Sequence, residues 1–142
     1  MAGTRKAPGA RRARPAAKAN AARGEFELVL AGNTYCLRPS YAAQVAIEEA
    51  LDQSMVELLR RANMCALQLG ELGVVVGAYI RAGADEADKI TRAVADERIA
   101  ELIYEEGVTA VYPVLTLLLA AAVTGGGPSS GAAKPVTETP TG

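Results

Sequence analysis

Residues 24–51 constrain the fold more than any other stretch, because they combine the signals of a β-hairpin with those of a capped helix. Over residues 26–30, large apolar side chains alternate with their neighbours at the period of a strand that buries one face. Gly32-Asn33 then separates this run from a second short one, and glycine at the first central position predicts a two-residue type II′ turn. The two runs are therefore predicted to pair as an antiparallel hairpin.

This turn fixes which residues of the two strands face each other. Apolar pairs fall on one side of the hairpin, and two opposite charges lie directly across the strands on the other, as cross-strand pairing favours. The predicted pairs are Leu30 with Tyr35 and Leu28 with Leu37 on the apolar face, and Val29 with Cys36 and Glu27 with Arg38 on the opposite face.

The second strand is predicted to end at Pro39, because proline has no N–H group to donate to a strand ladder. Ser40 is a good N-cap, which predicts a first helix from Tyr41 to about Gln53. An S-x-x-E capping box at Ser54 then predicts the start of a second helix. The sequence leaves open whether these helices are separate or form one bent rod.

Two further helical segments follow. The first, over residues 66–84, carries glycines at i, i+3 and i+7, and this shared small face predicts the close approach of a neighbouring backbone. The second lies in the charged stretch 85–107, where Asp85 and Asp96 each suit an N-cap and Gly107 ends a short helix. The glycines are Gly70, Gly73 and Gly77, and the inner residues of the short helix are Ile99, Leu102 and Ile103.

The last segment, residues 108–123, carries no charge, but it is shorter than the ~18–20 residues that span a bilayer. Pro113 lies in its first turns, where a helix tolerates proline. Apolar residues extend almost round this helix, and such a helix is either central to the fold or covered by a partner. Both interpretations follow equally from the pattern.

Composition places one domain between two tails. Residues 1–23 consist largely of Ala, Pro, Gly and basic residues, and residues 124–142 are rich in Gly, Pro, Ser and Thr. Both tails are too poor in large apolar residues to offset the entropy of ordering, so they are predicted to be disordered. Residues 24–123 are predicted to form one α+β domain, an N-terminal β-hairpin followed by a compact bundle of about four to five short α-helices.

Charge is divided unequally between the first tail and the remainder of the chain. Of 15 basic and 16 acidic residues, the first 23 residues hold 7 basic residues and no acid, which leaves 8 basic against 16 acidic residues, a balance of −8. A basic arm on an acidic body fits contact with an acidic partner or nucleic acid, a weak contact with its own domain, or a solubilising tail. The candidate nucleic-acid arm consists of Arg5, Lys6, Arg11, Arg12, Arg14, Lys18 and Arg23.

Several kinds of active site need residues that this chain lacks. It contains no histidine, which removes Ser-His and Cys-His nucleophile pairs and most catalytic zinc sites. Cys36 and Cys65 stand 29 positions apart without metal-ligand spacing, and with no apolar signal segment they are predicted to be free thiols in a reducing cytoplasm. We therefore predict no catalytic residue, no cofactor and no metal, and a protein that is not an enzyme.

A succession of short motifs, rather than any one of them, carries a resemblance to a known family. These motifs are residues 24–28 (GEFEL), 32–33 (GN), 35–39 (YCLRP) and 47–49 (IEE), followed by helical segments over 69–83 and 101–122. In this order they resemble the gene transfer agent family of small phage-tail proteins, over the folded hundred residues and neither tail. The resemblance implies a protein encoded among tail genes, described as a tail tube protein and similar to tail assembly chaperones. It implies no catalytic residues.

The leading hypothesis from this resemblance is a tail assembly chaperone, which keeps the tape-measure protein soluble while tube subunits polymerise around it. The alternatives are a structural tail tube component that contacts copies of itself, and a small nucleic-acid-binding protein that uses its arm. We expect it in the cytoplasm of the host bacterial cell or in the virion, without membrane contact. Candidate contacts are the open edges of the hairpin. The candidate apolar contacts are Met55, Leu58, Leu59, Leu115, Leu117, Leu118 and Leu119.

Overall fold

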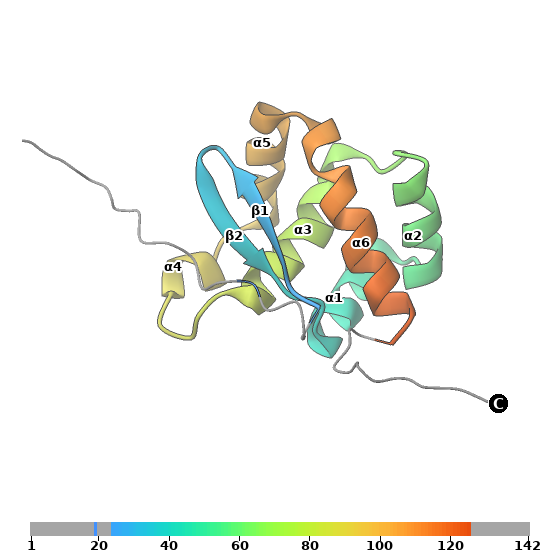
Figure 1. Ribbon diagram of the computed structural model, residues 1–142, viewed down its shortest axis with the longest axis horizontal. Helices are drawn as coiled ribbons and strands as arrows, with labels where there is room; N and C mark the ends of the chain where they lie inside the picture. Colours follow the sequence, from blue (N-terminus) through green and yellow to red (C-terminus); the bar gives the residue numbers. More distant parts are fainter. Residues whose placement is uncertain (1–18, 20–23, 126–142) are drawn as a thin grey trace, which may run out of the picture.

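The computed structural model describes residue 19 and residues 24–125, and this part of the chain forms a two-stranded antiparallel sheet followed by six α-helices (Figure 1). The elements are β1 (Phe26–Leu30), β2 (Asn33–Leu37), α1 (Tyr41–Leu51), α2 (Met55–Asn63), α3 (Leu69–Gly83), α4 (Lys89–Arg92), α5 (Asp96–Glu106), the 3₁₀ helix η2 (Val108–Ala110) and α6 (Tyr112–Val123). The α+β class is confirmed, with the single turn α4 as an additional helix. The tails predicted to be disordered lie almost entirely outside the described residues.

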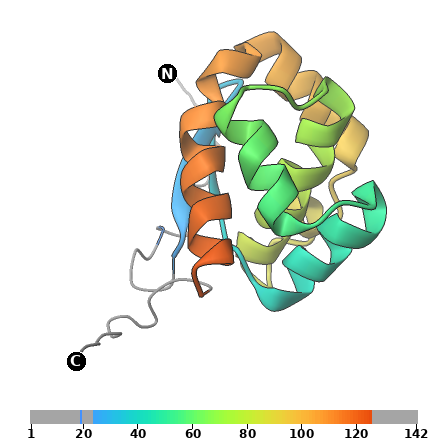
Figure 2. The ribbon, with the colours of Figure 1, turned by 90° about the vertical axis from the view of Figure 1, so that its right-hand side faces the viewer.

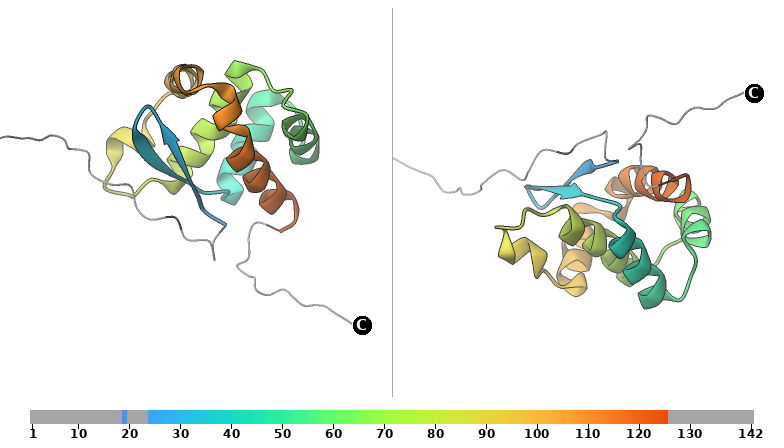
Figure 3. Two further views of the ribbon diagram at one scale, coloured as in Figure 1. Left: turned by 45° about the horizontal axis from the view of Figure 1, so that its top comes forward. Right: turned by 90° about the horizontal axis from the view of Figure 1, so that it is seen from below.

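Helix α3 lies at the centre of the domain. The hairpin forms a layer across it, α1 and α5 pack along it, and α6 lies beside β1 (Figures 1 and 3). Helix α2 packs against α6, so that these two helices form one side of the molecule (Figure 2). The buried residues of all these elements form a single hydrophobic core.

The hairpin forms as predicted, but its register differs by two residues from the predicted one. Ala31 and Gly32 are the central residues of the turn. Their φ angles of 51° and 82° are both positive, as a type I′ turn requires. The prediction of a type II′ turn centred one residue later was therefore wrong. The N–H of Ala31 donates to Oε1 of Glu106 at 3.1 Å, which ties the observed turn to α5.

The shift of two residues preserves the two faces of the hairpin but changes the ion pair. Leu28 and Leu30 face the core, as predicted, because a shift of two keeps each side chain on its side. Arg38 now lies opposite Glu25 rather than Glu27, with 3.8 Å between Nε and Oε2. The observed pairs are Phe26 with Leu37, Glu27 with Cys36, Leu28 with Tyr35, Val29 with Thr34 and Leu30 with Asn33.

Helices α1 and α2 are separate, and both begin at the predicted caps. The hydroxyl oxygen of Ser40 accepts the N–H of Ala43, and that of Ser54 accepts the N–H of Glu57, each at 3.1 Å. Asp52 adopts a left-handed conformation with φ of 54° and ends α1 two residues earlier than predicted. The chain therefore bends sharply between the two helices instead of continuing as one rod.

The close packing of α3 on α5 depends on two of the three predicted glycines. A Cβ atom on Gly73 would lie 2.7 Å from the carbonyl oxygen of Asp96 and 2.9 Å from Cβ of Ala100. A Cβ atom on Gly77 would lie 2.5 Å from Oδ1 of Asp96. Gly70, in contrast, has open space around it. The predicted packing role is therefore confirmed for Gly73 and Gly77 only.

The helix starts in the charged stretch differ from those predicted. Helix α4 begins after Asp88, whose carboxylate accepts an N–H of its first turn. Helix α5 has Ala95 at its N-cap position, and Asp96 is its first residue. The predicted N-caps Asp85 and Asp96 were wrong; the carboxylate of Asp96 pairs instead with Arg81 of α3, at 2.8 Å.

Helix α6 closes the core. It follows Gly107, which ends α5 as predicted, and it accommodates Pro113 in its first turn. The hydroxyl of Tyr112 donates to the carbonyl of Leu67 at 3.0 Å and accepts its N–H at 3.1 Å, which joins the start of α6 to the loop before α3. The largest fully buried residues are Tyr79, Leu30, Leu37, Ile47, Leu58, Leu72, Ile80, Ile99, Ile103, Leu115, Leu118 and Leu119.

Candidate protein-contact surface

Most of the predicted contact residues lie inside the domain. Leu58 of α2 and three leucines of α6 are at most 1% exposed, because the two helices pack against each other (Figure 2). Met55 and Leu59 are partly buried against the same core. Leu117 is different, with 54% of its surface exposed. The three leucines Leu115, Leu118 and Leu119, together with Leu58, are therefore core residues rather than contact residues.

One side of α6 forms the core, and the opposite side is uncovered. Residues three, four and seven positions apart share a side of a helix, and this spacing places four residues of α6, and Thr124 directly after its end, away from the core. Leu117 and Pro113 are exposed, and the alanines beside them are partly exposed. We call this surface the outer face of α6, and it consists of Pro113, Leu117, Ala120, Ala121 and Thr124.

The polar groups on this side of α6 are used within the helix itself. The hydroxyl of Thr116 donates to the carbonyl oxygen of Pro113 at 3.1 Å, and that of Thr124 donates to the carbonyl oxygen of Ala120 at 2.8 Å. Helix α6 carries no charged residue, whereas every other α-helix in residues 24–125 carries at least two. Its outer face therefore presents mainly hydrocarbon groups to solvent.

Sequence reasoning gave only Leu117 of this face and missed the smaller residues around it. Their signal was the long run without charge, from Gly107 to Ala133. The apolar pattern of α6 could not divide its residues between core and surface, because the pattern extends round the whole helix. The contacts with α2 and β1 make that division.

The edges of the hairpin are less open than predicted. Strand β1 runs beside α6 (Figures 1 and 3). At the other edge, a side chain on Gly83 of α3 would collide with the carbonyl of Cys36, and the N–H of Arg38 donates to the carbonyl of Tyr79 at 3.0 Å. On the side of the hairpin that points away from the core, Val29 is 50% exposed.

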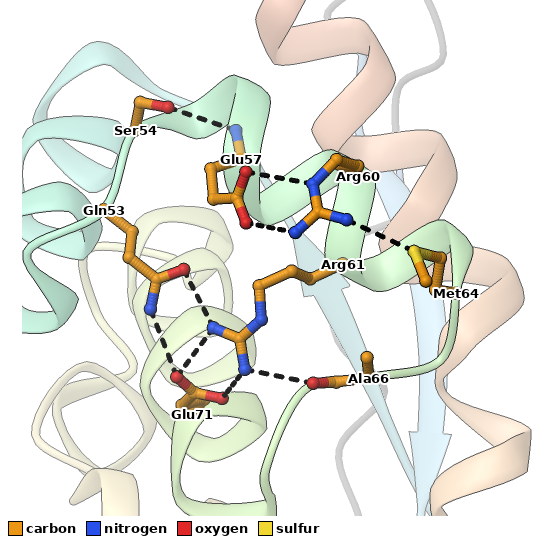
Figure 4. Close-up of polar contacts among 8 residues, drawn as sticks. All are labelled: Gln53, Ser54, Glu57, Arg60, Arg61, Met64, Ala66 and Glu71. Atoms are coloured by element: carbon orange, nitrogen blue, oxygen red, sulfur yellow. Dashed lines mark hydrogen bonds and ion pairs between the residues drawn. The ribbon is translucent and has the colours of Figure 1, made fainter.

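A polar network holds α2 against α3 (Figure 4). Arg61 donates to both carboxylate oxygens of Glu71, at 2.7 and 2.9 Å, and also to the side-chain oxygen of Gln53 and the carbonyl of Ala66. The side chains of Arg61 and Glu71 are 19% and 18% exposed. The hydrogen bonds from Arg61 hold the pKa of Glu71 below its ordinary value, and the same pair raises the pKa of Arg61.

A second ion pair lies on the solvent side of α2. Arg60 donates to Glu57 one turn before it, with 3.0 Å between Nε and Oε1, and another of its nitrogens lies 3.3 Å from the sulfur of Met64 (Figure 4). The hydrogen bonds from Arg60 lower the pKa of Glu57. Because both side chains are exposed, we expect the pair to add little to stability. It gives α2 a charged outer surface, unlike that of α6.

Cys36 is buried, and its thiol donates to Oε1 of Glu25 at 3.6 Å, whereas Cys65 is exposed. Among the described residues, no three metal-ligating side chains lie close enough together to hold a metal ion. No helix in this part of the chain has the length and apolar character needed to cross a membrane. The basic residues of the predicted nucleic-acid arm, from Arg5 to Arg23, lie outside the described residues.

A family model matches most of the chain. The family is described as "Phage tail tube protein, GTA-gp10", and the match covers residues 23–125, nearly the same stretch as the domain described above. No curated protein matches the sequence, and no solved structure matches it.

Proposed function

The chain belongs to the family of the phage tail tube protein GTA-gp10, and from this premise we propose that it is a tail assembly chaperone without catalytic activity. In this proposal the protein binds the tape-measure protein or a tail tube subunit by protein–protein contact during assembly. It acts in the cytoplasm of the host cell and is released before the particle is complete.

The closed core of the single chain carries this proposal. The buried side of α6 packs on α2 and β1 of the same chain, so a finished domain exists before any partner binds. A chaperone has to fold by itself and still offer apolar surface to another protein. The outer face of α6, with Leu117 at its centre, supports this role because it is apolar, uncharged and accessible.

The family description favours a second candidate, a structural component of the tail tube. A tube subunit forms repeated contacts with its neighbours, and head-to-tail contacts of this kind require two complementary patches on each subunit. A chaperone requires only one patch. The two roles therefore differ in what the purified protein does alone.

We would purify the full chain and measure its mass by size-exclusion chromatography with light scattering, alone and with the tape-measure and tube proteins encoded near it. The chaperone role predicts a small species alone and a stable complex with one of these proteins. Rings or long polymers formed by the chain alone would instead support the tube component. Absence of both complex and polymer would contradict both roles.

The composition of purified particles gives an independent test. A chaperone should be absent from finished particles, or present at trace levels, whereas a tube component should be among the more abundant proteins by mass spectrometry. The basic arm supports a further role in binding nucleic acid, which predicts salt-dependent binding that disappears when residues 1–23 are removed.

A further inference from the structure

We propose that the basic N-terminal arm, residues 1–23, folds back onto the outer face of the hairpin of its own chain and covers the end of that face that holds Glu25 and Cys36. Neither the chaperone role nor the tube role is needed for this inference. The outer face of the hairpin is the side of the two strands that points away from the core. It consists of Glu27 and Val29 of β1, Thr34 and Cys36 of β2, Glu25 directly before β1 and Arg38 directly after β2.

The two ends of this face differ in burial. The helices of residues 24–125 pack on the other side of the hairpin (Figure 3), and near the turn Val29 is 50% exposed, as expected of a sheet face that points to solvent. At the other end, Glu25 and Cys36 are each only 5% exposed. Cys36 is nevertheless outside the hydrophobic core that the described residues form. Burial at this end therefore calls for a cover on the outer side.

The buried end of the face carries a carboxylate. The thiol of Cys36 donates to Oε1 of Glu25 at 3.6 Å, and Nε of Arg38 lies 3.8 Å from Oε2. The side chain of Glu25 is 3% exposed, whereas that of Arg38 is 43% exposed. A carboxylate removed from water is stabilised by cations and hydrogen-bond donors around it. The segment that covers this end should therefore be basic rather than apolar.

The N-terminal arm has the required charge and is tethered to this end of the hairpin. It holds 7 basic residues and no acid, whereas residues 24–125 hold 7 basic and 15 acidic residues, so the two parts of the chain attract each other. Arg14, Lys18 and Arg23 all precede β1 closely. A short tether gives them a high effective concentration at the face, which favours the arm over a separate basic protein.

The chain can turn back at the start of β1. Gly24 has a φ of 74°, in the left-handed region that glycine adopts without strain, and it lies in a turn directly before the strand. The five residues of β1 span about 17 Å. The last ten residues of the arm, when extended, span up to about 35 Å. This part of the arm is therefore long enough to reach along the whole outer face.

The reaction of Cys36 with N-ethylmaleimide tests this proposal, because the uncharged reagent needs an uncovered thiol. In the full chain with Cys65→Ser, which removes the exposed thiol, Cys36 should react slowly. Changing Arg14, Lys18 and Arg23 to Gln should speed the reaction at least about tenfold, as expected if the uncovered state is populated at about 10% or less. Loss of positive charge beside a thiol disfavours the reactive thiolate and would by itself slow the reaction, so the two effects have opposite signs.

A second triple substitution is the matched control. Lys89, Arg92 and Arg98 are exposed basic residues of α4 and α5, and changing them to Gln should leave the rate unchanged. Urea unfolding should give all variants the same stability, so that faster reaction does not come from global unfolding. An unchanged rate in the arm variant would overturn the proposal, because the domain itself would then cover the thiol. Equal acceleration by both triple substitutions would overturn it too.

Paramagnetic relaxation tests where the arm lies. In a Cys36→Ala, Cys65→Ser background, a nitroxide on Ala17→Cys should broaden the amide signal of Glu27 on the hairpin more than that of Val56 on α2. The broadening should weaken at about 1 M salt, where exposed charges are screened. Equal broadening at both amides would contradict a contact at the hairpin. Broadening that appears only at high protein concentration would place the arm on a second copy and overturn the contact within the chain.

The arm variant separates this inference from the proposed function. If Cys36 stays protected in the arm variant while the complex with a tail protein forms, the arm contact is overturned and the chaperone role stands. If Cys36 becomes reactive in the arm variant but no tail protein binds the unmodified chain, the arm contact stands and the chaperone role fails. Where the contact stands, the hairpin and any acidic partner compete for the same arm.

Discussion

Helices α3 and α5 meet through glycines, whereas α2 and α6 meet through leucines. Gly73 and Gly77 lack the side chains that would keep α5 away, so the backbone of α3 approaches Asp96 and Ala100 directly. In the other pair, large side chains fill the space between the helices. Substitutions that add atoms should therefore destabilise the α3–α5 contact most, and substitutions that remove atoms should destabilise the α2–α6 contact most.

Ion pairs link α3 to α5 and also to α2, and these two pairs differ in their exposure. Arg81 pairs with Asp96 between α3 and α5, where both side chains are about one-third exposed. Arg61 pairs with Glu71 between α2 and α3, where both are less exposed and hydrogen bonds from neighbouring groups surround them. We expect the second pair to contribute more, because screening by water weakens the first.

The largest effect should follow removal of a core leucine from the α2–α6 contact. Leu118→Ala should lower the free energy of unfolding by about 2–5 kcal/mol, because it removes a fully buried side chain and leaves a cavity. Leu117→Ala makes the same change on the other side of the same helix and should cost less than about 1 kcal/mol. Urea unfolding at protein concentrations below any association would measure both, and similar losses would contradict the division of α6 into two faces.

Adding one methyl group should distinguish the α3–α5 contact. Gly73→Ala should destabilise the domain by about 1–3 kcal/mol, because its Cβ atom would press against the backbone of α5. Gly70→Ala is the control on the same helix; it meets open space and should stabilise by up to ~1 kcal/mol, since alanine favours helix more than glycine. The midpoint temperature of thermal unfolding should fall for Gly73→Ala and rise for Gly70→Ala. Stabilisation by both would show that α5 moves aside freely.

Loss of the charge on Glu71 should have a smaller effect. Glu71→Gln should destabilise the domain by about 1–2 kcal/mol, because Arg61 would lose its charged partner in a largely buried position. Glu57→Gln removes a carboxylate from an exposed ion pair of α2 and should change stability much less. Equal effects of the two substitutions in chemical unfolding would contradict a special role for the Arg61 network.

The smallest effect should be on pH dependence. The unmodified protein and Glu71→Gln should differ in unfolding free energy by an amount that changes with pH. The pKa of Glu71 in the folded state lies below its ordinary value of 4.5. The contribution of its carboxylate to stability is therefore present above pH 4.5 and is lost as the pH falls through the pKa of the folded state. The difference in unfolding free energy should stay constant from pH 7 to about 6 and narrow below about pH 4. A difference that widened in acid would have the wrong sign for this carboxylate.

The hairpin shows how far the sequence determines local structure. The alternation of Leu28 and Leu30 predicted the buried face correctly, because a face depends only on whether positions are odd or even. The register was missed because the turn places Ala31 in a left-handed conformation that alanine seldom adopts. The N–H of Ala31 bonds to Glu106, 75 positions away, and no local pattern could have indicated this contact.

The candidate contact surface was predictable only in its composition. An uncharged, apolar last helix could be read from the chain, and Leu117 was among its predicted contact residues. The separation of Leu117 from Leu118 required knowledge of where α2 and β1 lie, which depends on packing across the whole domain. The same limitation applied to Asp96, whose partner Arg81 is on another helix.

The hydroxyl of Tyr112 turns one backbone amide into a reporter for the movement of α6. The amide of Leu67 lies in a loop, yet its hydrogen is held by a side chain from the start of α6. Its exchange with deuterium therefore requires this part of α6 to move away, whereas the amides within α6 can exchange when the helix frays. If Leu67 exchanges as slowly as the amides of α3, then α6 leaves only when the whole domain unfolds. Faster exchange at Leu67 would mean that α6 separates from a domain that is otherwise folded.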